Sequence, residues 1–110
     1  MPWEKHMNTM EYMGAVKAAL GIESDYALSK ALNVTRQTVS RYVQGKGYFD
    51  DAVAVKVAEL LQIHPGLVML DMHRERAKTP AEQTIWQEIY QGFLTLLPHA
   101  KSVRSIALPR

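Results

Sequence analysis

Residues 24–45 contain two short helical patterns separated by a break of only three residues. The spacing of apolar residues predicts one helix over residues 25–32 and a second over residues 36–44. Each predicted helix follows a residue that caps helix N-termini well, Ser24 in the first case and Thr35 in the second. A chain with this pattern is constrained to pack two short helices across a tight turn.

The apolar residues of these helices can reach one another only if the helices cross, which defines a helix-turn-helix unit. In such a unit the second helix lies in the major groove of DNA, with its N-terminal residues at the base edges. The residues expected to meet at the crossing are Leu28, Leu32 and Val34 from the first part and Val39 with Tyr42 or Val43 from the second.

Helical spacing and helix-capping signals continue on both sides of this unit, and no sustained alternation predicts a strand. The sharpest signal is the sequence Thr79-Pro80-Ala81-Glu82, a capping box with proline at the first helical position. The sequence therefore predicts an all-α fold. The other helices are expected over residues 9–20, 51–62, 66–77 and 79–97, and residues 98–110 are expected to form a basic, mobile tail.

The side chains left on the outer face of the second helix are suited to DNA. Arginine pairs with guanine and glutamine with adenine through two hydrogen bonds, so Arg36, Gln37, Arg41 and Gln44 are candidate base contacts. Short hydroxyl side chains suit phosphate oxygens instead. The candidate phosphate contacts of this kind are Thr35, Thr38 and Ser40.

The positive charge of the chain is concentrated on the same segment. The whole chain has a formal net charge of only +2. A local basic patch on a nearly neutral protein fits one discrete anionic partner, and double-stranded DNA is the expected one. Residues 24–49 carry four basic residues, Lys30, Arg36, Arg41 and Lys46, against the single acidic residue Asp25.

The stretch from Ala27 to Gly45, ALSKALNVTRQTVSRYVQG, resembles the helix-turn-helix of lambda-repressor-like regulators of the Cro/repressor, or XRE, type. The likeness is specific over about 22 residues, and the order of five helices over residues 7–77 fits the same family. It implies a five-helix DNA-binding domain followed by a sixth, C-terminal helix. It also implies base contacts by Arg36, Gln37, Arg41 and Gln44, and phosphate contacts by Ser24, Thr35, Thr38, Lys46 and Tyr48.

Two residues depart from the family pattern. Ser29 stands where alanine is usual, at the closest approach of the two helices, and its hydroxyl needs a hydrogen-bond partner. Tyr42 stands at a core position that is usually aliphatic, so its ring can pack while its hydroxyl reaches a phosphate.

A second segment shows a different likeness. The stretch from His73 to Trp86 resembles the tail of small regulator-like proteins of filamentous and other phages.

The sixth predicted helix carries an apolar stripe that is broader than a small core requires. Two interpretations stay open, in which the stripe either completes the core or forms a dimer interface. We expect a homodimer held at least partly by residues 79–97, and a protein partner could also use this helix. The expected interface residues are Trp86, Tyr90 and Phe93.

Other classes of protein are disfavoured. The chain has no cysteine, no apolar run long enough to cross a membrane and no secretory signal at its start, so a cytoplasmic protein is expected. His64, Asp71 and His73 are the candidate metal ligands, but Asp71 and His73 lie two residues apart and so point to different sides of a helix. We therefore expect no metal, and we expect no cofactor. Glu82 and Glu88 are likewise separated around a helix, and we expect no enzyme.

These observations predict a sequence-specific, double-stranded-DNA-binding transcription regulator that reads the major groove with residues 36–44. A phage or prophage repressor or Cro-like protein fits this description. Two alternatives stay open: the antitoxin of a toxin–antitoxin pair that uses the same motif, and a helical protein-interaction module.

Overall fold

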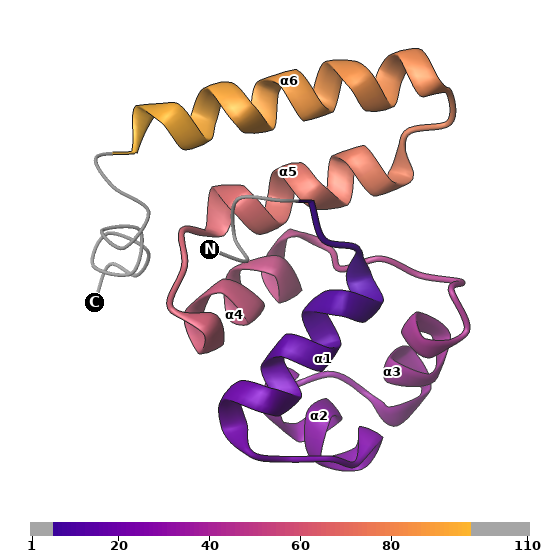
Figure 1. The fold of residues 1–110 in the computed structure, drawn as a ribbon. Coiled ribbons are helices and arrows are strands. Elements are labelled where there is room, and N and C mark those ends of the chain that lie inside the picture. Colours follow the sequence, from indigo (N-terminus) through magenta and orange to yellow (C-terminus); the bar gives the residue numbers. More distant parts are fainter. Residues whose placement is uncertain (1–5, 98–110) are drawn as a thin grey trace.

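The computed structural model describes residues 6–97, and every regular element within that range is a helix (Figure 1). The all-α prediction is therefore confirmed, and each helix end lies within about two residues of its expected place. The helices are α1 (Thr9–Leu20), α2 (Asp25–Leu32), α3 (Arg36–Val43), α4 (Asp51–Leu61), α5 (Pro65–Arg76) and α6 (Pro80–Leu96). The expected basic tail, residues 98–110, lies outside the described residues.

The predicted crossing of the two short helices is present. Leu28, Leu32 and Val39 are all buried where α2 packs on α3. The turn between the helices is closed by Asn33, which adopts a left-handed backbone conformation with φ of 58°. Asparagine tolerates this conformation better than most residues because its short polar side chain can hydrogen-bond locally. These helices lie at the end of the molecule away from α6 (Figure 1).

The helix starts follow the capping residues that the sequence indicates. Side-chain oxygens of Ser24, Thr35, Asp50 and Thr79 each accept a hydrogen bond from the first turn of their helix. The expected capping box of α6 is only half right. The carboxylate of Glu82 accepts from the backbone N–H of Lys78, one residue earlier than a capping box requires.

The core contains two residues that helical spacing did not indicate. Phe49 lies in the loop before α4 and Ile63 in the loop after it, and both are fully buried. The ring of Phe49 contacts the rings of both Tyr12 and Tyr42, so this loop residue joins α1 to α3. Of the two alternatives expected at the helix crossing, Tyr42 is buried and Val43 is 42% exposed.

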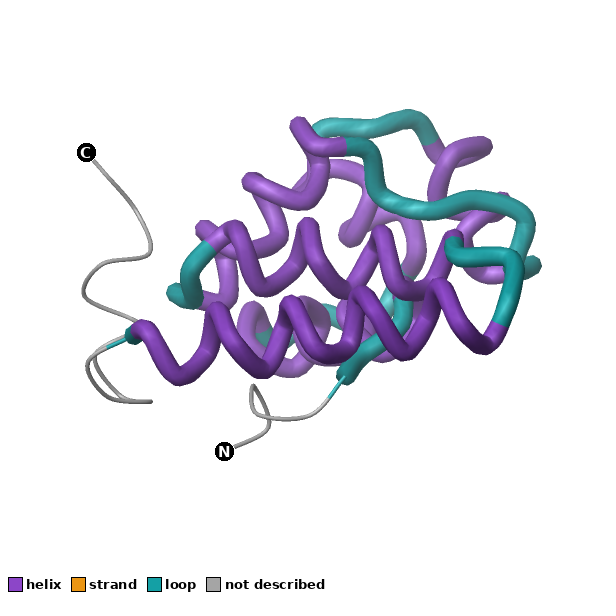
Figure 2. Tube along the Cα trace, turned by 90° about the horizontal axis from the view of Figure 1, so that it is seen from above, coloured by secondary structure: helices purple, strands orange, loops and turns teal. Residues whose placement is uncertain are grey.

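Helix α6 forms the outermost layer and packs along α5 (Figures 1 and 2). Trp86 stacks on the His73 ring at 4.5 Å, and Phe93 meets the His64 ring edge-on at 5.0 Å. Tyr90 is only 1% exposed. The side chain of Tyr90 is buried within its own chain, so it is not exposed for the dimer contact that the sequence predicts. Trp86 and Phe93 are also partly covered by α5.

A buried carboxylate joins the start of α1 to α5. Asp71 is completely buried, and it accepts hydrogen bonds from the hydroxyl of Tyr12 and the backbone N–H of Met7. His6 Nδ1 lies 3.4 Å from Asp71 Oδ1. Burial raises the pKa of the Asp71 carboxyl, and the hydrogen bonds from Tyr12 and His6 act in the opposite direction. Asp71 is thus a structural residue that fixes the N-terminal segment.

The contact between α5 and α6 can be tested at a glycine. A Cβ atom at Gly66 would lie 2.9 Å from Cζ of Phe93 and 3.1 Å from Nδ1 of His64. We expect Gly66→Ala to lower the free energy of unfolding by about 1–3 kcal/mol, because the Phe93 ring has to move. Denaturant unfolding of the full chain measures the change.

Gly14 is the matched control for this substitution. It lies within α1, and nothing lies within 4 Å of a Cβ atom built there. Gly14→Ala should leave stability unchanged or raise it by about 0.5–1 kcal/mol, because alanine favours a helix. Equal effects of the two substitutions would contradict the close packing of Phe93 on α5.

Candidate nucleic-acid interface

The N-terminus of α3 is open to solvent and well ordered by its cap. Thr35 Oγ1 accepts a hydrogen bond from the backbone N–H of Thr38 at 3.1 Å and lies 2.9 Å from the Thr38 hydroxyl. No acidic residue lies in the first turn. The partial positive charge of a helix N-terminus is therefore left available to an anion such as a DNA phosphate.

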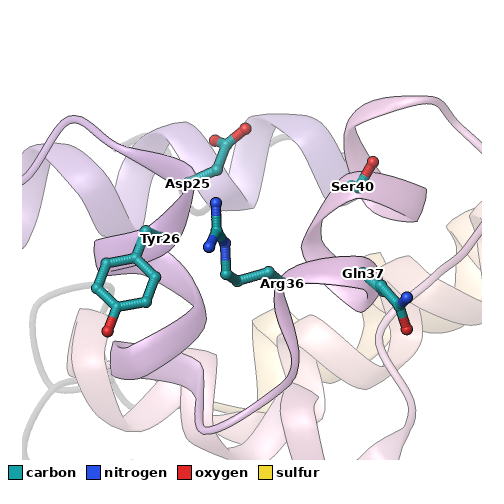
Figure 3. Close-up of a pocket in the computed structure, with 5 residues that line it drawn as sticks. All are labelled: Asp25, Tyr26, Arg36, Gln37 and Ser40. Carbon is teal, nitrogen blue, oxygen red and sulfur yellow. The ribbon is translucent and has the colours of Figure 1, made fainter.

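Arg36, Gln37 and Ser40 lie together at the start of α3, and all three are exposed. With Asp25 and Tyr26 of α2 they line a hollow of about 320 Å³ (Figure 3). The side chain of Arg36 extends toward α2, whereas that of Gln37 points away from it (Figure 3). The structure thus brings together the first two candidate base contacts on one accessible surface, but it directs them to different sides.

Arg41 and Gln44 are exposed, but each makes a contact within its own chain. Arg41 Nη2 donates a hydrogen bond to the carbonyl oxygen of Lys46 at 2.8 Å, which holds the loop after α3 against the helix. Gln44 was expected inside the helix, but it is the C-cap, and its Nε2 lies 3.2 Å from Ser40 Oγ. Both side chains therefore hold hydrogen bonds within the chain in the absence of DNA.

Three of the expected phosphate contacts lie outside α3, before α2 and after α3 in the chain. Ser24 is exposed and caps α2 through a 3.0 Å hydrogen bond from the backbone N–H of Ala27. Lys46 and Tyr48 lie in the exposed loop between α3 and α4. Polar and basic side chains near a recognition helix are suited to fixing its position on the DNA backbone.

Both departures from the family pattern have a structural explanation. The buried hydroxyl of Ser29 donates a hydrogen bond to the carbonyl oxygen of Tyr26 at 2.6 Å, so it has the partner it requires. Tyr42 is only 4% exposed, and its ring meets that of Phe49 edge-on at 5.1 Å. Burial raises the pKa of Tyr42. The ring of Tyr42 therefore belongs to the core.

Tyr26 and Lys30 were not among the expected site residues. The Tyr26 ring is 51% exposed and lies beside the candidate base contact Arg36. Lys30, one turn further along α2, lies over the same ring. The signal available in the sequence was an aromatic and a basic residue four apart on the first helix of the motif, which places them on one helix face.

The charge of α6 differs from that of the helix-turn-helix. Its sequence contains two glutamates and no lysine or arginine. Within residues 6–97, no three histidine, cysteine or acidic side chains are grouped so that they could hold a metal ion. None of the helices described has both the length and the apolar character that crossing a membrane requires.

Comparison with known protein families finds a match to the helix-turn-helix segment. The family described as Helix-turn-helix matches residues 19–68, which include the whole of α2, α3 and α4. Residues 19–68 are thus similar to this helix-turn-helix family. The match begins within α1 and ends early in α5, so it contains every candidate DNA contact described above.

The remaining matches are to phage proteins. The family described as Phage related protein matches residues 69–95, which cover most of α5 and α6. An uncharacterised protein of Pseudoalteromonas phage PM2 is 29% identical over 89 residues, which cover 76% of this chain and 96% of that protein. No solved structure matches the chain significantly. The chain is thus similar to a DNA-binding helix-turn-helix regulator of phage type.

Proposed function

We propose that this helix-turn-helix protein is a sequence-specific transcription regulator of the repressor or Cro-like kind. In this proposal it acts in the cytoplasm and reads the major groove of double-stranded DNA with α3. The observation that carries the proposal is the exposed start of α3, whose first turn contains Arg36 and Gln37 and no acidic residue.

The chemistry of each side chain decides whether we assign it to a base or to a phosphate. Arg36 and Gln37 offer paired hydrogen-bonding groups that match guanine and adenine edges, so they supply sequence preference. The hydroxyls of Ser24, Thr35 and Thr38 and the cation of Lys46 carry no such pairing, so they position α3 on the phosphates. Arg41 already donates one hydrogen bond to the carbonyl oxygen of Lys46, so we expect it to contribute less to sequence preference than Arg36 and Gln37.

Selection from a pool of random duplexes tests this function. The full chain should enrich one short sequence that contains guanine or adenine at the positions nearest Arg36 and Gln37. Because a symmetric dimer reads two half-sites, the enriched sequence should also be a palindrome. Recovery of DNA without any preferred sequence would contradict sequence-specific regulation.

We propose further that the protein acts as a homodimer, through a different part of α6 from the one the sequence indicated. Ile85, Ile89 and Leu96 are 54%, 44% and 81% exposed, and they follow one another at spacings that place them on one side of the helix. Gly92 lies in the same row and would let a second helix approach closely. The row resembles the apolar seam of a coiled coil.

Sedimentation of the full chain measures this association. At micromolar concentration we expect a mass of twice the 12.5 kDa of one chain. The double substitution Ile89→Glu and Leu96→Glu should give a monomer, because it places charges in an apolar contact. A matched control, Gln87→Glu with Gln91→Glu, adds the same charge at two other exposed positions of α6 and should remain dimeric. A monomeric unsubstituted chain would contradict the homodimer.

The same apolar row favours one other function, that of an antitoxin that holds a toxin through α6. Such a protein would still bind DNA through α3, so the DNA experiments do not separate it from a repressor. Co-expression with the product of the neighbouring gene does so, because an antitoxin forms a stable complex with it. A pure interaction module, by contrast, would show little salt-dependent binding to DNA.

A further inference from the structure

Two cations lie over the exposed ring of Tyr26. Nζ of Lys30 and Cζ of Arg36 are each 5.3 Å from the ring centroid, within the range in which a cation is attracted to an aromatic face. Lys30 belongs to the same helix as Tyr26, whereas Arg36 is the first residue of α3. The contact with Arg36 therefore joins the two helices of the motif on their outer surface.

This contact determines where the Arg36 guanidinium lies. The side chain runs along the hollow between α2 and α3, with the Tyr26 ring on one side and Asp25 nearby (Figure 3). The Asp25 carboxylate is already paired with Lys17, whose Nζ lies 2.9 Å from Asp25 Oδ1. Because Asp25 pairs with Lys17, the neighbour that contacts the Arg36 guanidinium is the Tyr26 ring.

A free arginine side chain populates many rotamers, and ordering it costs conformational entropy when it binds. A ring that already holds the guanidinium reduces this cost, and it leaves the N–H groups free to make paired hydrogen bonds with a guanine. We propose that Tyr26 is a specificity-determining residue of the DNA interface, which positions Arg36 so that it reads one guanine. This inference rests on the function proposed above.

The experiment compares two duplexes, the selected one and a second in which the base pair read by Arg36 is replaced. Selection with an Arg36→Ala variant identifies that pair, because the preference for guanine should disappear at one position only. The measured quantity is the ratio of the two dissociation constants. Tyr26→Leu should reduce this ratio about two- to five-fold, the range supported by an exposed cation–π contact.

Two variants serve as controls. Tyr26→Phe keeps the aromatic face and should keep the ratio, although it loses the hydroxyl. Lys30→Ala removes the second cation over the ring, and it should weaken binding to both duplexes equally because Lys30 lies on α2 and not on the recognition helix. In the free protein, the ring-current shift of the Arg36 side-chain protons should be lost in Tyr26→Leu and retained in Tyr26→Phe.

The possible results separate the inference from the function on which it rests. An unchanged ratio in Tyr26→Leu, or an equal loss on both duplexes, overturns the positioning role of Tyr26. An Arg36→Ala variant that keeps every base preference of the unsubstituted chain overturns it as well. Failure of the unsubstituted chain to enrich any sequence contradicts the proposed function itself. Because half of the Tyr26 side chain is exposed, thermal melting should show that Tyr26→Leu folds normally.

Discussion

Leu32→Ala should lower the free energy of unfolding by about 2–5 kcal/mol, a large part of the stability of a small domain. Leu32 is only 2% exposed and ends α2, where it packs with Leu28 and Val39 at the crossing of the two short helices. Truncation to alanine loses the apolar contacts and leaves a cavity that the rigid turn at Asn33 prevents from closing. Denaturant unfolding followed by circular dichroism measures the loss.

Leu20→Ala is the matched control for the core substitution. Leu20 ends α1, as Leu32 ends α2, but it is 41% exposed. A change within about 0.5 kcal/mol is expected there, because surface substitutions away from special features have small effects. If both substitutions destabilised the chain equally, the helix crossing would not be the tightly packed unit described above.

Gln37→Ala should weaken binding to the selected duplex by about 1–3 kcal/mol and binding to a random duplex much less. Gln37 is exposed at the second position of α3, and its side chain points away from the Tyr26–Arg36 contact (Figure 3). Loss of a paired hydrogen bond to a base is felt only where that base is present. Titration of both duplexes at one fixed salt concentration separates the two contributions.

The control for this variant is Gln87→Ala, which removes the same side chain from an exposed position on α6. It should leave the affinity for both duplexes unchanged. An equal loss of affinity on both duplexes in Gln37→Ala would assign Gln37 to the DNA backbone and not to a base.

The order and limits of the helices could be predicted because the signals that set them are local. Ser24, Thr35 and Asp50 hydrogen-bond to residues only three positions away, so the sequence alone identifies them as caps. The crossing of α2 and α3 could also be predicted, because the short break at Asn33 and Val34 permits few other arrangements. The candidate base contacts are the polar residues on the face of α3 that this crossing leaves exposed.

Contacts between residues distant in sequence could not be predicted in this way. Phe49 is buried only because Tyr12 and Tyr42 converge on it from other helices. Tyr90 is buried because α6 folds back along α5, and helical spacing cannot say which part of an apolar stripe meets that neighbour. The hydrogen bond from Arg41 to Lys46 depends on the path of a loop, for which no periodic pattern exists.

The affinity of the full chain for the selected duplex and for a shuffled duplex, measured over a range of salt concentrations, tests specific DNA recognition most directly. Phosphate contacts release counterions, so affinity for both duplexes should fall steeply with salt. At each salt concentration the selected duplex should bind about a thousand-fold more tightly or better, as specific regulators do. Equal affinity for the two duplexes, or affinity that does not depend on salt, would contradict DNA recognition by α3.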